Sequence, residues 1–210
     1  MTAARLFLTV AVSFFLTCVA GAENIIFKAD SMTGKSQDNK DYAKLTGNAS
    51  IITESMEIYA DIIELSGENY RFIEASGSVS GTNMKNKIDF TCGQLLYDRQ
   101  TEIATLQNSV HLIDRENDTV ANAEIMDYDQ NKSTIIMQIS VAMQQKDNIC
   151  TGSHAIYKTD THILFLSGNP QITRGSDAFR AQEIELNLDT QDIIMDGRVR
   201  GSVEDAKDKQ

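Results

Sequence analysis

Apolar and polar residues alternate strictly around six short phrases that recur along the chain, such as "LTGNAS" at residue 45 and "LSGNPQ" at residue 166. Each phrase has a central position, which we call the repeat anchor. The anchors are Gly47, Gly77, Asn108, Ile139, Gly168 and Gly197, spaced by 30, 31, 31, 29 and 29 residues. The positions two and four residues to either side of each anchor are apolar or glycine. Because successive side chains of a strand point to opposite faces, this alternation predicts a strand with one buried face at every anchor.

A second segment recurs in phase with the first and centres on a small residue. These small positions are Ala29, Ala60, Cys92, Ala123, Thr151 and Ala181, spaced by 31, 32, 31, 28 and 30 residues. Apolar residues mostly lie two before the small residue and, in all but the first copy, three and five after it. The apolar face therefore changes parity at the small residue, which predicts a bulge or bend there.

The repeating unit is about 30 residues long and consists of two strands separated by turn-forming phrases such as "SGEN" and "DQNKS". A regular period of 20 to 50 residues is typical of stacked, solenoid-like folds. No segment after the N-terminal leader shows the i, i+3, i+4, i+7 spacing of an amphipathic helix. The sequence therefore predicts an all-β fold, in which hairpins fold over and enclose a long apolar interior. Periodicity alone leaves open whether that interior packs on itself or holds a ligand.

The first residues resemble a secretory leader. Arg5 precedes an apolar stretch from residue 6 to 19, and a small-x-small site ends at Ala22. We expect a signal peptide at residues 1–22, cleaved before Glu23, and export to a periplasm. An uncleaved membrane anchor is the alternative, although the stretch is short and interrupted by polar residues. We expect one domain at residues 23–203 and a charged, flexible tail at 204–210.

The charge balance excludes one class of partner. Removing Arg5 with the leader lowers the count of Lys and Arg from 19 to 18 against 30 Asp and Glu, a net charge of −12. Nucleic-acid binding relies on clustered Lys and Arg, so we expect no nucleic-acid partner. An anionic ligand would have to bind through something other than overall charge.

The residues that carry chemistry are few and scattered. Metal-binding motifs, a nucleophile elbow and a phosphate-binding glycine loop are all missing from the sequence, so we expect no enzyme, no catalytic residues, no metal and no cofactor. Cys92 and Cys150 fall on equivalent strands two units apart and differ in parity. Strand spacing places them about 10 Å from each other, which is beyond the reach of a disulfide, so we predict free thiols. His154 falls on an inward position, where we expect a partly buried, hydrogen-bonded side chain.

The chain resembles the OstA-like family of lipopolysaccharide transport proteins in its repeated phrases. These phrases are "AKLTGNASI", "EIYADIIELSG", "IEASGSVSG", "LFLSGNPQI" and "FRAQEIELNLD". The resemblance covers residues 25 to 203 and is nearer to the soluble, LptA-like periplasmic bridge than to the LptC-like inner-membrane component. It implies an open β-jellyroll, or β-taco, whose apolar groove holds the acyl chains of the lipid. It also implies head-to-tail stacking and partners of the same family in the inner and outer membranes. The chain departs from the family pattern at Asn108 and Ile139, where glycine is the rule, and at Thr151.

The inward positions of the predicted strands are then the candidate lipid-binding residues. They are Leu45, Ile51, Ile63, Val79, Leu95, Leu106, Val110, Leu112, Met126, Met137, Val141, Met143, Leu166, Ile172 and Ile184. The implied function is carriage of lipopolysaccharide or a related glycolipid from the inner to the outer membrane. Two alternatives stay open: a structural protein that polymerises through its edge strands, and a membrane-anchored component of the same transport system.

Overall fold

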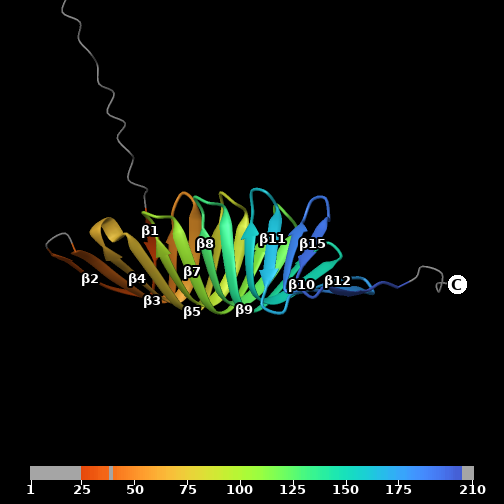
Figure 1. The fold of residues 1–210 in the computed structure, drawn as a ribbon. Helices are drawn as coiled ribbons and strands as arrows, with labels where there is room; N and C mark the ends of the chain where they lie inside the picture. Colours follow the sequence, from red (N-terminus) through yellow and green to blue (C-terminus); the bar gives the residue numbers. More distant parts are fainter. Residues whose placement is uncertain (1–24, 38–39, 205–210) are drawn as a thin grey trace, which may run out of the picture.

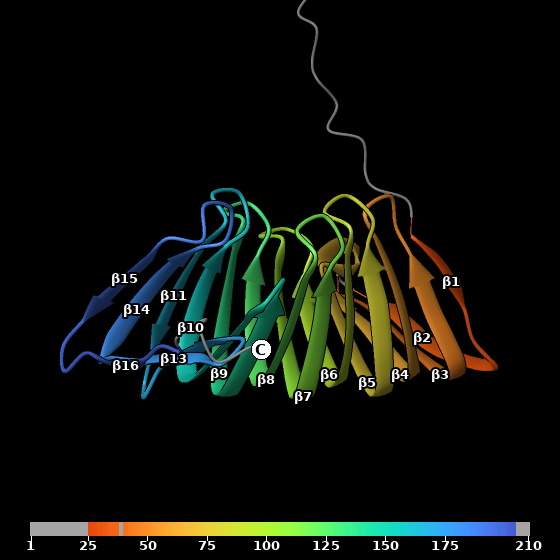
Figure 2. The same ribbon diagram turned by 90° about the vertical axis from the view of Figure 1, so that its right-hand side faces the viewer.

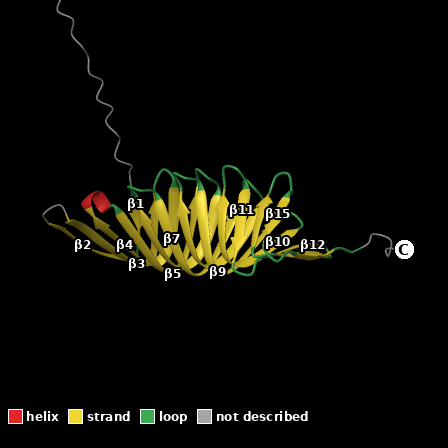
Figure 3. Cartoon of the chain, viewed as in Figure 1, coloured by secondary structure: helices red, strands yellow, loops and turns green. Residues whose placement is uncertain are grey.

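The protein forms one antiparallel sheet of 16 strands whose order follows the chain almost without exception. The structure is a computed structural model that describes residues 25–37 and 40–204. Figures 1 and 2 show the strands progressing along the length of the molecule from the N-terminal end to the C-terminal end. Figure 3 shows strands throughout, with one short helical turn, η1 (Glu68–Tyr70). The all-β prediction is therefore confirmed.

The strands alternate in direction and are joined by short turns. Their bounds are β1 (Ile26–Lys28), β2 (Ser31–Gln37), β3 (Lys40–Ile52), β4 (Met56–Gly67), β5 (Phe72–Asn83), β6 (Ile88–Asp98), β7 (Ile103–Asp114), β8 (Thr119–Asp129), β9 (Thr134–Gln145), β10 (Asn148–Lys158), β11 (Ile163–Ser167), β12 (Gln171–Arg174), β13 (Asp177–Arg180), β14 (Glu183–Asn187), β15 (Ile193–Asp196) and β16 (Arg200–Ser202).

Every repeat anchor is a sharp bend. The anchor and the residue after it both have positive φ, for example 77° and 45° at Gly47 and Asn48, and 77° and 49° at Gly77 and Ser78. Glycine reaches this left-handed region at no steric cost, and Asn is the next most tolerant residue. The strand register shifts at each bend, for instance between Thr46 and Ala49. The recurring phrase is thus the place where the sheet folds over.

The bends also explain one of the two departures from the glycine pattern. Each glycine anchor packs against the residue that follows a small position on a neighbouring strand, as Gly77 does against Asp61, where an added Cβ would lie 3.0 Å from the aspartate Cβ. At Asn108 the facing residue is Gly93, and a Cβ there would lie 2.8 Å from the Asn108 Cβ. In this copy the glycine is the facing residue, Gly93, and not the anchor, so the side chain of Asn108 fits into the contact.

The bends divide the sheet into two arms. The first arm contains β1, β12, β13, β16 and residues 49–52, 56–60, 79–83, 88–92, 110–114, 119–123, 141–145 and 148–152. The second arm contains β2, β11, β14, β15 and residues 40–46, 62–67, 72–76, 94–98, 103–107, 125–129, 134–138 and 154–158. Each arm ends in a row of turns. We call the turns at 53–55, 84–87, 115–118, 146–147 and 175–176 the first rim, and those at 68–71, 99–102, 130–133, 159–162 and 188–192 the second rim; each rim includes the two strand residues on either side of its turns.

The structure corrects one position in the predicted repeat. The small residue of the fifth copy is Gly152, which pairs with Val141 just as Cys92 pairs with Val79. The prediction of Thr151 is therefore one residue too early. The error also misplaced His154, which pairs with Gln138 on the outer face and not on the inward one. Both alignments satisfy the apolar pattern in this copy, because the outward residues Ile149 and Ile156 are apolar like the inward Cys150, Ala155 and Tyr157.

The strands at one end of the sheet are β1 and β2, and those at the other end are β15 and β16. The predicted signal peptide and its cleavage site lie outside the described residues, as do residues 205–210 of the predicted tail. In the described part of the chain, no helix combines the length and the apolar character that crossing a membrane requires.

Ile139 is the one anchor with a β-branched side chain, at φ 64° and 54 % exposed. This conformation costs an L-residue about 1–2 kcal/mol, more than the extra entropy of about 0.5–1 kcal/mol that glycine loses on folding. We expect Ile139→Gly to raise the free energy of unfolding by up to about 1 kcal/mol in urea denaturation. Ile149, 47 % exposed in β10 and without positive φ, is the matched control. Ile149→Gly should lower stability by roughly 0.5–1 kcal/mol; equal losses at both sites would contradict the strain assigned to Ile139.

Candidate functional site

The space between the arms is apolar and closed to solvent. All fifteen residues predicted to line it are buried, each with at most 3 % of its surface exposed. They belong to a single cluster of buried side chains that extends from Ala43 in β3 to Leu188 after β14. The sequence therefore placed these residues correctly on the inward face, and whether they contact a ligand stays a prediction.

Two inward rows of cross-strand neighbours run from one edge of the sheet to the other. The row in the second arm consists of Met32, Leu45, Ile63, Ala75, Leu95, Leu106, Met126, Met137, Ala155, Leu166, Ile184 and Met195. A matching row crosses the first arm from Phe27 to Gly201, and includes Ile51, Leu112 and Ile172. An uninterrupted apolar track thus spans the molecule and ends only at its two edges.

Side chains of the two rims meet and close the space between the arms, along a line that we call the seam. Near the middle, Asn83 donates from Nδ2 to Oε1 of Gln130 at 2.9 Å, and Asn86 Nδ2 donates to the hydroxyl of Tyr128. Further along, the Tyr157 hydroxyl donates to Oδ2 of Asp114 at 3.3 Å. The seam joins two rims by side-chain hydrogen bonds, whereas neighbouring strands are joined by backbone ladders.

Four polar residues of the seam, Asn83, Asp114, Gln145 and Asn148, are buried, which makes their pairing necessary. Asn83 and Asp114 are 1 % and 2 % exposed. Asp114 also accepts backbone N–H bonds from Glu116 and Asn117 at 3.0 and 3.1 Å, so one carboxylate both shapes a turn and holds the opposite rim. Burial, followed by the nearby charge of Asp114, raises the pKa of the Tyr157 hydroxyl well above its usual range. Tyr157 therefore stays a neutral hydrogen-bond donor.

At the C-terminal end the seam is a compact polar cluster around Gln191. Asn148 Nδ2 donates to Gln191 Oε1, and Gln191 Nε2 donates to Oε1 of Gln145 at 3.3 Å. Arg174 donates to Asn148 Oδ1 at 2.9 Å and to the Gln191 carbonyl at 3.1 Å. The last turns of both rims are thereby tied together.

The seam is the part of the site that sequence reasoning missed, although a signal was present. Its first-rim members sit six residues after the anchors, at Asn83, Asp114, Gln145 and Arg174. Each occupies an inward position by parity and is polar, so it breaks the apolar pattern in the same place in successive repeats. A polar residue that recurs at the same inward position in successive repeats indicates that its side chain is hydrogen-bonded in the fold.

Cys92 and Cys150 are free thiols, as predicted, but the reason differs. Both point inward, and Cys150 takes the position of Phe90 and not that of Cys92. They lie in β6 and β10, which the strand order separates by four steps, roughly 19 Å at about 4.8 Å per step. That distance is far beyond disulfide reach.

Burial makes both thiols poor nucleophiles, which supplies a test of the closed interior. Desolvation raises the pKa of Cys92 to about 11 and that of Cys150 to about 12. Because the thiolate is the reactive form, we expect labelling at pH 8 to be at least roughly 100-fold slower than for a free cysteine, and to accelerate as the pH rises. Timed alkylation followed by mass spectrometry measures this. Labelling at the free-cysteine rate in the native protein would mean that the arms stand open in solution.

The comparison with known families agrees with this architecture. The family described as LptA/(LptD N-terminal domain) LPS transport protein matches residues 27–163. Among solved structures, the chain resembles LptH, the LptA-homologous periplasmic component of the lipopolysaccharide transport device of Pseudomonas aeruginosa. That likeness has 10 % identity over 87 % of this chain and 96 % of the other, with a TM-score of 0.27, and adds nothing to the assignment. No curated protein sequence matches the chain. On the family match, this chain belongs to the LptA/LptD N-terminal domain family of lipopolysaccharide transport proteins.

Proposed function

We propose that this protein is a non-catalytic carrier that takes lipopolysaccharide or a related glycolipid across the periplasm, as a bridge from the inner to the outer membrane. The two apolar rows that run from edge to edge are the observation that carries the proposal. They offer acyl chains a track along the whole length of the molecule. Membership of a lipopolysaccharide transport family supports the choice of lipid.

The lipid reaches the interior when the arms part along the seam. Burial of an acyl methylene is worth about 0.8 kcal/mol, so a chain of about twelve gives roughly 10 kcal/mol. Each neutral hydrogen bond of the seam contributes only about 0.5–1.5 kcal/mol net. Since the bends hold the arms together by continuous backbone, the seam is the place where separation costs least. The polar headgroup then stays outside, between the rims.

Site-specific photocrosslinking tests this placement. Met137 and Gln138 are neighbours in β9 that point to opposite faces, with Met137 buried and Gln138 partly exposed. A photoreactive residue at position 137 should crosslink to added lipopolysaccharide, and one at 138 should not. Equal crosslinking yields at positions 137 and 138 would contradict the proposal, because they would mean that the lipopolysaccharide adsorbs to the outer surface.

The proposal includes pairing of the two edges, so that the track continues into a neighbouring chain. Ser76 pairs with Gln94 inside the molecule, and the equivalent positions at the edges are Asp196 and Ser31. In a head-to-tail stack of copies, a chain carrying Asp196→Cys and Ser31→Cys should therefore form disulfide-linked oligomers on oxidation. The control pairs Asp196→Cys with Met32→Cys, whose side chain points to the other face. Equal ladders from both pairs on a non-reducing gel, or none from the first, would contradict this register.

A further inference from the structure

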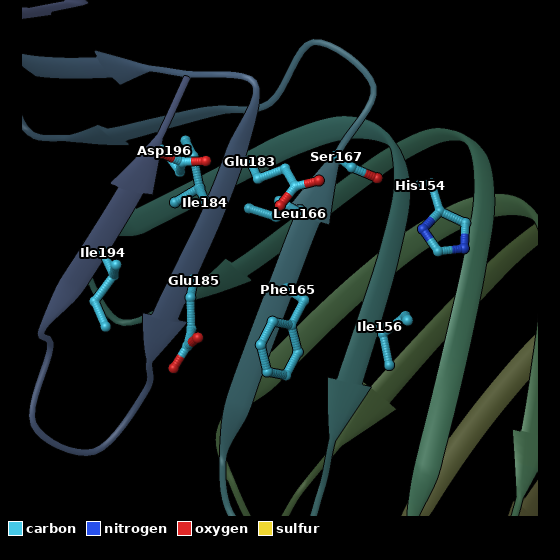
Figure 4. Close-up of a pocket in the computed structure, with 10 residues that line it drawn as sticks. All are labelled: His154, Ile156, Phe165, Leu166, Ser167, Glu183, Ile184, Glu185, Ile194 and Asp196. Carbon is cyan, nitrogen blue, oxygen red and sulfur yellow. The ribbon is translucent and has the colours of Figure 1, made fainter. Parts of the chain in front are cut away.

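The outer face of the second arm has a hollow of about 440 Å³ near its C-terminal end. Figure 4 shows its lining side chains, which come from β10, β11, β14 and β15. His154, Ser167, Glu183 and Asp196 form one row of cross-strand neighbours. A second row lies farther from the bend. The hollow is on the opposite side of the sheet from the apolar track.

The second row forms an apolar floor of the hollow, although its residues occupy outward positions of the sheet. Ile136, Ile156 and Phe165 are consecutive neighbours across β9, β10 and β11, and Ile194 follows beyond Glu185. Phe165 and Ile194 are 41 % and 63 % exposed. On a sheet with one buried face the outer positions are normally polar.

Apart from Leu96 in β6, the other half of the same row follows that rule, which makes the departure local. At its N-terminal end the row carries Lys44, Glu64 and Glu74 in succession. Lys44 and Glu64 form an ion pair at 2.7 Å. The apolar floor is therefore not a property of the repeat. An exposed apolar patch on a protein surface commonly marks a site that contacts another molecule.

Three carboxylates border the floor, and none has an internal cation. Glu183 and Asp196 face each other directly across β14 and β15, an arrangement that destabilises a sheet. Glu185 lies between Phe165 and Ile194. Within residues 25–37 and 40–204, the side chains of these three acids make no ion pair or hydrogen bond, whereas Asp98, Asp129 and Glu64 each contact a Lys or Arg.

We propose that this hollow is a docking site for a protein segment that carries an apolar side chain flanked by Lys or Arg. The apolar anchor fills the hollow over Phe165 and Ile194, and the flanking cations relieve the repulsion between Glu183 and Asp196. The acidic border repels anionic lipid headgroups, so a membrane surface does not fit. Leu166 and Ile184, which face the lipid track, also line the hollow, but the residues proposed to bind the segment are outward ones.

The test uses the full mature chain and two labelled peptides that alternate Phe or Ile with either Lys or Glu. Fluorescence anisotropy should show binding of the Lys peptide and at least tenfold weaker binding of the Glu peptide. Phe165→Ser and Glu185→Lys should each weaken the Lys peptide at least fivefold. Leu96→Ser is the matched control, because Leu96 occupies the same outward row in β6 with 43 % of its surface exposed. It should leave binding unchanged.

Several results would overturn the docking site. These are equal affinity for both peptides, no binding of the Lys peptide, or a loss of Lys-peptide affinity in Leu96→Ser that equals the loss in Phe165→Ser. Binding of the wild-type chain to anionic phospholipid vesicles that is lost in Phe165→Ser would assign the face to a membrane. Self-association in sedimentation that is lost in Phe165→Ser would assign it to a second copy. None of these variants alters an inward residue, so photocrosslinking at position 137 separately reports on lipid carriage.

Discussion

A covalent link across the seam will abolish lipid uptake, and cleavage of the link will restore it. The variant pairs Asn83→Cys with Gln130→Cys, which replace residues that hydrogen-bond at 2.9 Å from opposite rims. A short cleavable bismaleimide tether between them prevents the arms from parting. The variant is made in a chain in which Cys92 and Cys150 are replaced by alanine, so that the tether can react only with the two introduced thiols. Uptake of a fluorescent lipopolysaccharide measures the result.

The control is a tether of the same kind within one rim. Lys87 and Glu116 belong to successive turns of the first rim and form an ion pair at 3.5 Å. Linking Lys87→Cys to Glu116→Cys leaves the seam free, so uptake should remain normal. If the Asn83–Gln130 tether also leaves uptake normal, the lipid does not enter by parting the rims, and the seam has no role in loading.

A charge placed in the middle of the apolar track will remove lipid binding. Val141 is 2 % exposed and pairs with Gly152 at the inward side of the bend. Val141→Glu introduces a carboxyl group with no partner, which costs several kcal/mol against a typical total stability of about 5–15 kcal/mol. We expect a lower unfolding midpoint and loss of lipid crosslinking at position 137. Val110→Glu should behave in the same way, since Val110 is the equivalent residue in β7.

Ala142→Glu controls for added charge, because Ala142 is the next residue of β9 and faces outward. It should retain both stability within about 0.5 kcal/mol and lipid binding. Crosslinking is measured at low temperature on the folded fraction, as judged by circular dichroism. A folded Val141→Glu chain that binds lipid at the wild-type level would show that the acyl chains lie elsewhere.

The inward face could be predicted from sequence because strand side chains have a period of two and the repeat supplied six copies of the pattern. Even the polar anchor Asn108 obeyed the register. Its compensation could not be foreseen, because Gly93 meets Asn108 only across neighbouring strands. At the fifth copy the alignment failed for a different reason: Ile149 and Ile156 are apolar but face outward, so a register one residue too early fitted the pattern and His154 was assigned to the wrong face.

The recurring polar positions of the seam were visible in the sequence, but their pairing could not be predicted. Asn83 meets Gln130, 47 residues away, and Asp114 meets Tyr157, 43 residues away. These separations are about one and a half units, so each pair joins different copies of the repeat. Alternation within a strand contains no information about contacts between the two rims. The open β-jellyroll that the family resemblance implied is confirmed as one open antiparallel sheet, and the seam adds side-chain contacts between its two rims.

Native mass spectrometry of the protein, purified from the cells that naturally produce it and followed by lipid extraction, tests the central claim most directly. The account predicts a folded chain with an acylated glycolipid bound, and loss of that lipid in Val141→Glu but not in Ala142→Glu. A lipid-free protein that forms concentration-dependent oligomers would contradict it, and would instead identify a structural polymer with a dry interior.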